Sequence, residues 1–143
     1  MTDPLPPDAH APPVSFHRRT AAIAERLPDL REALARWLAT LGRFNVRLSL
    51  ERREDIVLAG YEAMANSAEH AYPRGQAGPV EVRAEAQPGR VTVTVTDYGT
   101  WRPPVASNGL RGRGLPLIDT LADHSAQVHR DDGTTVTMTW LTD

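Results

Sequence analysis

The chain has 143 residues, a formal net charge of -2 and no cysteine. This length suits one domain with its own hydrophobic core, and the nearly balanced charge argues against a nucleic-acid-binding surface. The lack of cysteine excludes a disulfide framework and thiol chemistry. No apolar run approaches the length of a transmembrane helix, and the first residues show no signal-peptide pattern. We therefore expect a cytoplasmic, single-domain protein that contacts neither nucleic acid directly nor a membrane.

The N-terminal segment, residues 1–13, is dense in proline and polar residues. Such a segment buries little apolar surface, so we expect a flexible tail ahead of a folded domain at 14–143. The domain opens with a weak alternation of apolar and polar residues from Val14 to Arg19. This alternation predicts a short edge strand.

A helix is predicted next, because leucines recur at helical spacing between Leu27 and Leu41. Pro28 suits its first turn, and Gly42 suits the left-handed position just past its end.

A second helix is predicted from Ser49, as its N-cap, to about Tyr72, where Pro73 stops it. Its core-facing stripe consists of small and apolar residues, which suggests close packing against a sheet or a ligand: Ile56, Gly60, Ala63, Ser67 and Ala71, with Val57 and Met64 beside them.

The remaining sequence predicts four strands, a long loop and a short helix. Two strands, at 80–86 and 91–96, are joined by a Pro88-Gly89 turn. The loop follows at 100–112 and the helix at 115–122. Two more strands are predicted at 125–129 and 134–141. The element order is therefore β-α-α-β-β-α-β-β. It predicts an α/β fold of the α+β two-layer type, with a mixed, mostly antiparallel sheet and helices on one face.

Three polar residues are spaced four apart on the second helix: Glu62, Asn66 and His70. On an α-helix they project from nearly one ridge, so a divalent cation and a proton acceptor could sit one turn apart. The alternative is that this ridge is only the solvated edge of an amphipathic helix.

Two glycine-containing motifs follow. Asp97-Tyr98-Gly99 ends a strand, where the carboxylate can accept a hydrogen bond from an exocyclic amine and the glycine lets backbone approach a flat ring. Gly112-Arg113-Gly114-Leu115 directly precedes a helix, whose free N–H groups suit phosphate oxygens. Each motif by itself also fits an ordinary turn. Thr134 could place a hydroxyl near the base, but its position equally fits a hairpin.

Taken in order, these motifs resemble the nucleotide site of the GHKL ATPase superfamily, and within it the RsbW-like anti-sigma-factor serine/threonine kinases. The run Glu62 to Tyr72 resembles the N box, Asp97-Tyr98-Gly99 the first glycine box, and Gly112 to Ile118 the second. The likeness extends from about Val14 to Leu141.

The resemblance implies a Bergerat-type ATP-binding fold with ATP and Mg²⁺ as cofactors. By position, Asn66 would ligate Mg²⁺, and Glu62 would be the general base. Asp97 would bind the adenine amine in a pocket shaped by Gly99, and Thr134 would lie near the adenine through water. The second glycine box would hold phosphate, through Gly112, Arg113, Gly114 and Leu115. His70 is interpreted as structural.

The resemblance also implies partners: a sigma factor, and a STAS-domain anti-anti-sigma protein that receives the phosphate on serine or threonine. Such proteins often dimerise, here through the surface near Val14 to Arg19. Trp101 stands where the family's first box usually has a second glycine, and Ser67 where alanine is usual. Trp101 favours an alternative, a non-catalytic binding module of the same fold that sequesters a protein partner.

Overall fold

The computed structural model describes residues 13–73, 75–100 and 114–142. Its elements confirm the predicted order: β1 (Val14–Ala21), η2 (Ala24–Arg26), α1 (Leu27–Ala39), η3 (Leu41–Phe44), α2 (Leu50–His70), β2 (Pro79–Gln87), β3 (Arg90–Asp97), α3 (Gly114–Leu121), β4 (His124–Arg130) and β5 (Gly133–Leu141). The predictions for the tail and for the 100–112 loop fall almost wholly outside the described residues.

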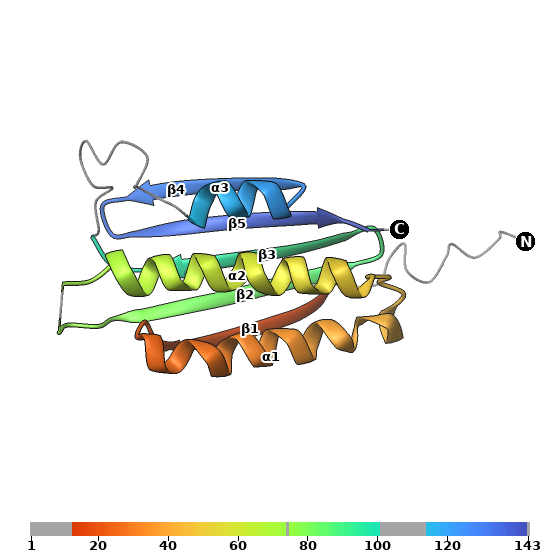
Figure 1. Cartoon of the computed structure of the whole chain (residues 1–143), viewed down its shortest axis with the longest axis horizontal. Helices are drawn as coiled ribbons and strands as arrows, with labels where there is room; N and C mark the ends of the chain where they lie inside the picture. The colour runs from red at the N-terminus through yellow and green to blue at the C-terminus, as the bar shows by residue number, and fades with distance from the viewer. Residues whose placement is uncertain (1–12, 74, 101–113, 143) are drawn as a thin grey trace, which may run out of the picture.

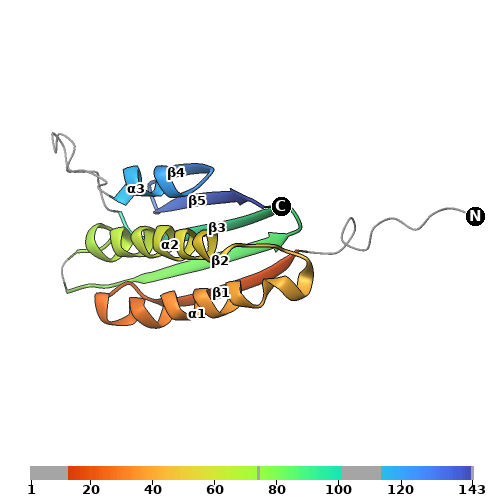
Figure 2. The ribbon, with the colours of Figure 1, turned by 45° about the vertical axis from the view of Figure 1, so that its right-hand side comes forward.

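The five strands form one sheet in the order β1-β2-β3-β5-β4, and every neighbouring pair is antiparallel. The three helices lie over the same face of the sheet, which two views 45° apart both show (Figures 1 and 2). This is the predicted two-layer arrangement, with a fully antiparallel rather than mixed sheet among the described strands. β1 lies at an edge, as predicted, and runs two residues beyond Arg19.

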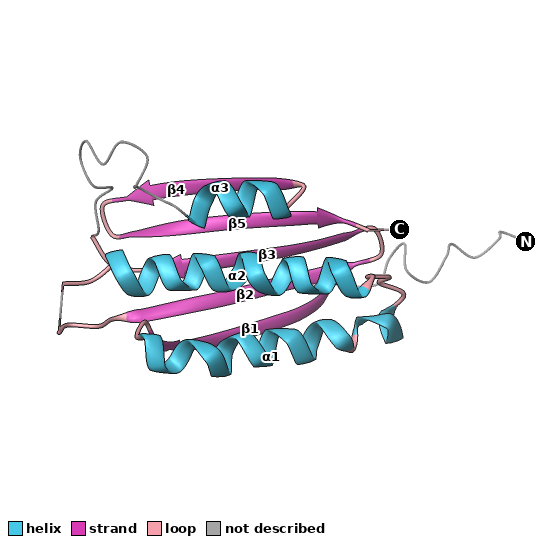
Figure 3. Ribbon diagram, in the orientation of Figure 1, coloured by secondary structure: helices cyan, strands magenta, loops and turns pink. Residues whose placement is uncertain are grey.

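Figure 3 shows the helices as one layer and the strands as the other. The hydrophobic core consists of buried side chains from both layers. α1 contributes a buried stripe of leucines, and the strands contribute alternate apolar side chains from β2, β3 and β5. Trp140 is fully buried, and its indole Nε1 donates to the Leu121 carbonyl at 2.8 Å. Each such large side chain contributes about 1.5–3 kcal/mol when buried.

The prediction that Gly42 takes the left-handed position after α1 is wrong. α1 ends at Ala39 and continues into the 3-10 turn η3, and the left-handed residue is Asn45, with φ 61°. The tighter turn keeps Leu41 completely buried, and asparagine is among the few residues that tolerate this conformation.

The predictions for α2 are confirmed at its N-terminus and along its core face. The Ser49 hydroxyl accepts from the Arg52 backbone N–H at 3.0 Å, which caps the helix. The small residues of the stripe are buried and let α2 lie close to its neighbours. A Cβ added to Gly60 would stand 3.2 Å from the Leu34 side chain.

The other face of the sheet carries no helix among the described residues. Alternate residues of β3 and β5 on this face are half-buried threonines, for example Thr94 and Thr137, which are register partners. We call this surface the open face. Within the described part of the chain, no helix combines the length and apolar character needed to cross a membrane.

Candidate nucleotide-binding site

Asp97 is the centre of a buried hydrogen-bonded group where α2, β3 and β5 meet. Its side chain is 1% exposed at the end of β3. One carboxylate oxygen accepts from the Gly99 N–H at 3.2 Å and the Thr134 N–H at 3.3 Å. The other accepts from the Ser67 hydroxyl of α2 at 2.9 Å. Three donors from three parts of the chain thus fix this carboxylate in place.

Gly99 and Gly133 let the backbone segments of this group approach one another. A Cβ on Gly99 would lie 1.9 Å from the Ala71 carbonyl oxygen at the C-cap of α2. A Cβ on Gly133 would lie 2.2 Å from the Asp97 carbonyl oxygen. The structure therefore gives Gly99 a packing role against α2, in addition to the predicted role of shaping a nucleotide pocket.

Thr134 lies directly opposite Asp97 in the register of β3 and β5 and is 4% exposed. Its hydroxyl lies 3.1 Å from Nδ1 of His129, the residue opposite it on β4. The structure thus places Thr134 beside Asp97, as a shared site requires. Its predicted water-mediated contact with adenine stays a prediction.

Glu62 and Asn66 lie one turn apart on α2, and both are half-buried. Asn66 directly precedes Ser67, the helix residue that donates to Asp97. His70 is the last residue of α2, with Nε2 at 3.7 Å from the Glu69 carboxylate. The predicted ridge on α2 therefore adjoins the Asp97 group, because Asn66 and Ser67 are neighbours in the chain.

The second glycine box is only partly visible. Gly114 and Leu115 begin α3, which packs against α2. Gly112, Arg113 and Trp101 lie outside the described residues, so their predicted roles are not tested.

Tyr72 connects the end of α2 to the strands. Its hydroxyl donates to the Pro79 carbonyl at 2.5 Å and accepts from the Tyr98 N–H at 2.9 Å. A Cβ added to Gly78 would lie 2.4 Å from the Tyr72 ring, so the ring packs directly against this glycine. Burial, as the main cause, raises the pKa of Tyr72 above its ordinary value, so it remains a neutral donor.

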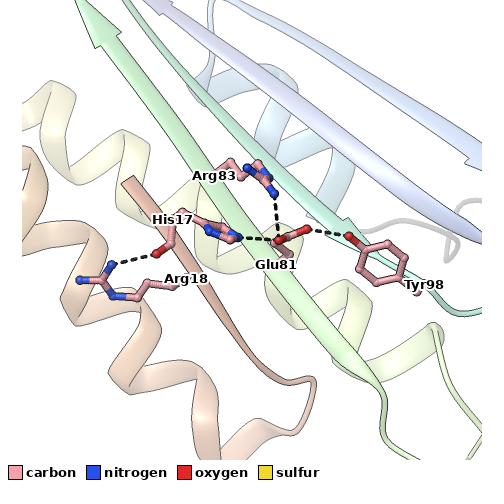
Figure 4. Close-up of polar contacts among 5 residues, drawn as sticks. All are labelled: His17, Arg18, Glu81, Arg83 and Tyr98. Atoms are coloured by element: carbon pink, nitrogen blue, oxygen red, sulfur yellow. Dashed lines mark hydrogen bonds and ion pairs between the residues drawn. The ribbon is translucent and has the colours of Figure 1, made fainter. Parts of the chain in front are cut away.

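Glu81 forms a second polar cluster, on the open face. Its carboxylate accepts from the Tyr98 hydroxyl at 2.6 Å and Arg83 Nη2 at 3.2 Å, and it lies 2.5 Å from His17 Nε2 (Figure 4). The hydrogen bond from Tyr98, followed by that from His17, holds the pKa of Glu81 below its ordinary value. The same bond is the main cause that raises the pKa of Tyr98.

Glu81 should make stability depend on pH in the acid range. Its folded-state pKa lies below the ordinary value of 4.5, so the native state favours the ionised carboxylate. The resulting stabilisation is fully present above pH 4.5 and is lost as the pH falls through the folded-state value. We expect the difference in unfolding free energy between wild type and Glu81→Gln to shrink at acid pH, measured by urea unfolding at several pH values. A difference independent of pH would contradict this.

Several residues that organise the site carry no sequence signal of that role. In the sequence, Ser67 belongs to the core-facing stripe of the second helix and stands where alanine is usual, and Tyr98 is the middle residue of Asp-x-Gly. Glu81 reads as an ordinary polar position in an alternating strand. Nothing in the local sequence marks it as buried, because two of its partners, His17 and Tyr98, come from other segments.

One cavity of the described residues lies apart from the Asp97 group. It measures about 480 Å³ and lies beside the C-terminal end of α2, with Glu25, Ala68 and Tyr72 in its lining. Neither Asp97 nor Asn66 lines it. The polar contacts converge instead on Asp97, which stays the predicted centre of the nucleotide site.

The described side chains suit Mg²⁺ bound together with a nucleotide better than a metal ion held by protein side chains alone. Among them, no cluster of three or more His, Cys, Asp or Glu side chains could hold a metal. Mg²⁺ typically takes one or two protein oxygens and completes its shell with water and phosphate oxygens. The side-chain oxygen of Asn66 suits that arrangement, and the carboxylate of Asp97 is the acceptor that an exocyclic amine requires.

Comparisons with known proteins agree with this fold. A family model described as a histidine kinase-like ATPase domain matches residues 20–140. The solved RsbU and RsbW domains of Rv1364c from Mycobacterium tuberculosis are 26% identical, with a TM-score of 0.70 over 91% of this chain and 33% of that one. The histidine kinase domain of a blue-light activated kinase from Erythrobacter litoralis shares the fold, at 20% identity and a TM-score of 0.57 over 78% of this chain and 60% of that one.

This chain spans about a third of the length of the Rv1364c structure. The family match covers most of the chain, and an ATPase domain of this kind implies ATP binding and, in general terms, phosphoryl-transfer chemistry. The chain belongs to the histidine kinase-like ATPase family.

Proposed function

We propose that this chain is an ATP-dependent serine/threonine protein kinase of the anti-sigma-factor type. The observation that carries the proposal is the position of Glu62 and Asn66 on α2. They stand one turn apart, next to the Ser67 that donates to buried Asp97. The similarity to a structure named for its RsbW domain supports the same class.

In this proposal ATP with Mg²⁺ supplies the transferable phosphoryl group. The side-chain oxygen of Asn66 holds the cation, and Asp97 accepts from the adenine amine. Glu62 accepts the proton of the attacking serine or threonine hydroxyl. Backbone amides from Gly112 to Leu115 hold phosphate. Such chemistry requires mainly positioning and charge neutralisation, which these residue types provide.

The proposed partners follow from the same class. The substrate is a small STAS-domain antagonist, and the sequestered partner is a sigma factor in the cytoplasm. A surface near Val14 to Arg19 would form the homodimer. The second candidate is a binding module without transfer activity, which Trp101 in the first glycine box favours. Glu62 argues against it, since a module that only binds needs no base beside a metal ligand.

Nucleotide binding can be tested first and phosphate transfer second. At about 100 times Kd, Mg²⁺-ATP should stabilise the wild type by about 2.7 kcal/mol, a rise in Tm of roughly 5–15 °C. Asn66→Ala should abolish the shift. Glu62→Gln should keep the shift and lose about 10²–10⁴-fold in phosphate transfer to a co-occurring STAS-domain protein.

Glu69→Gln is the matched control, because Glu69 is exposed on the same helix outside the proposed site. It should keep both the shift and the transfer. No shift in the wild type at millimolar nucleotide would overturn the ATP site. A shift without transfer would support the binding module, and transfer at full rate in Glu62→Gln would remove the assigned base.

A further inference from the structure

Glu81 is a buried carboxylate on a sheet face that no described helix covers. The residue is 6% exposed, although its strand neighbours alternate normally between the two faces. Its register partner on β1 is Arg19, and its other contacts are His17, Arg83 and Tyr98. The side chains of His17, Arg83 and Tyr98, and not the helix layer, surround the carboxylate (Figure 4).

Tyr98 is held at both its backbone and its ring. Its N–H donates to the Tyr72 hydroxyl at 2.9 Å, and its own hydroxyl donates to Glu81 at 2.6 Å. The Arg19 guanidinium lies over the ring, 5.5 Å from its centre. An aromatic residue that is 46% exposed is thus fixed by three contacts, from the turn after α2, from β1 and from β2.

The chain position of Tyr98 gives these contacts a consequence for the site. Tyr98 stands between Asp97 and Gly99, and successive side chains of an extended backbone point to opposite faces. Asp97 turns inward to Ser67 of α2, and Tyr98 turns to Glu81 on the open face. The backbone between them is therefore held from both sides of the sheet.

We propose that Tyr98 is a positioning residue for nucleotide binding: its hydrogen bond to Glu81 fixes the Asp97-Tyr98-Gly99 turn and so couples the open face to nucleotide affinity. This rests on the proposed ATP site at Asp97. The competing explanation is purely structural, with Glu81 serving only to join β1 to β2. The two explanations differ in whether nucleotide affinity changes when the Tyr98 hydroxyl is removed.

Tyr98→Phe keeps the ring and its contact with Arg19 but removes the hydroxyl. In the full chain, Kd for Mg²⁺-ATP measured by calorimetry should rise about three- to tenfold, the effect of one hydrogen bond. Glu81→Leu, which removes the acceptor, should raise Kd similarly. Glu81→Gln keeps an acceptor oxygen and should stay within about twofold of wild type. The Tyr98→Phe, Glu81→Leu double variant should bind no more weakly than either single variant.

Arg83→Gln is the matched control. Arg83 contacts the same carboxylate through the other oxygen, leaving the bond to Tyr98 intact. Its Kd should equal that of wild type. An unchanged Kd in Tyr98→Phe with a lower Tm would leave only the structural role and overturn the proposal, as would an equal loss in Arg83→Gln. A wild type that binds no nucleotide would overturn the proposed function itself, which separates the two failures.

Discussion

Gly99→Ala is expected to destabilise the fold by about 3 kcal/mol and to abolish nucleotide binding. The added Cβ would lie 1.9 Å from the Ala71 carbonyl oxygen and 2.9 Å from the Ala71 Cβ. The obstacle is backbone at the C-cap of α2, not the end of a flexible side chain, so α2 and the turn after β3 must separate. That separation would also move the Gly99 N–H away from Asp97. Urea unfolding and a thermal shift with Mg²⁺-ATP would measure both effects.

Gly42→Ala provides the control for the same chemical change. Apart from its own chain neighbours, no described atom lies within 4 Å of an added Cβ there, and Gly42 is not among the glycines with positive φ. Stability should stay the same or rise by a few tenths of a kcal/mol, because alanine restricts the unfolded chain. Equal effects of the two substitutions would contradict the close approach of Gly99 to α2.

Asp97→Asn is expected to weaken nucleotide binding by at least about tenfold and to cost roughly 1–3 kcal/mol of stability. The Gly99 and Thr134 N–H groups both point at one carboxylate oxygen, so the asparagine oxygen must take that position. The asparagine NH₂ then replaces the other oxygen, beside Ser67, and presents donors where an adenine amine needs an acceptor. Calorimetry with Mg²⁺-ATP and urea unfolding would test these two effects separately.

Ser67→Ala is the comparison variant for Asp97→Asn. It removes the Ser67 hydroxyl as a donor to Asp97 but keeps the carboxylate as an acceptor. Its cost should therefore be smaller, about 1 kcal/mol, with nucleotide still bound. Normal ATP affinity in Asp97→Asn would exclude Asp97 as the adenine-binding residue, whatever happened to stability.

Local sequence patterns predicted which segments form helices and strands, but the end of α1 less accurately. The leucine spacing of α1 and the alternation in β2 and β3 depend only on which face meets the core, so they are readable from neighbouring residues. The end of α1 was misplaced because continuation into η3 keeps Leu41 buried, and that depends on packing against other segments. The predicted roles of Glu62 and Asn66 stay predictions, and their shared ridge on α2 follows from spacing alone.

The sequence by itself determined the order of strands and helices, the Ser49 cap and the one-turn spacing of Glu62 and Asn66, because these follow from periodicities of two and 3.6 residues. Only the tertiary structure brought Ser67 and Thr134 to Asp97, from 30 and 37 positions away in the chain. It also buried Glu81 beneath side chains of β1 and of the turn after β3. The physical reason is strand register: a shift of one residue in the β3–β5 pairing would turn Thr134 to the other face.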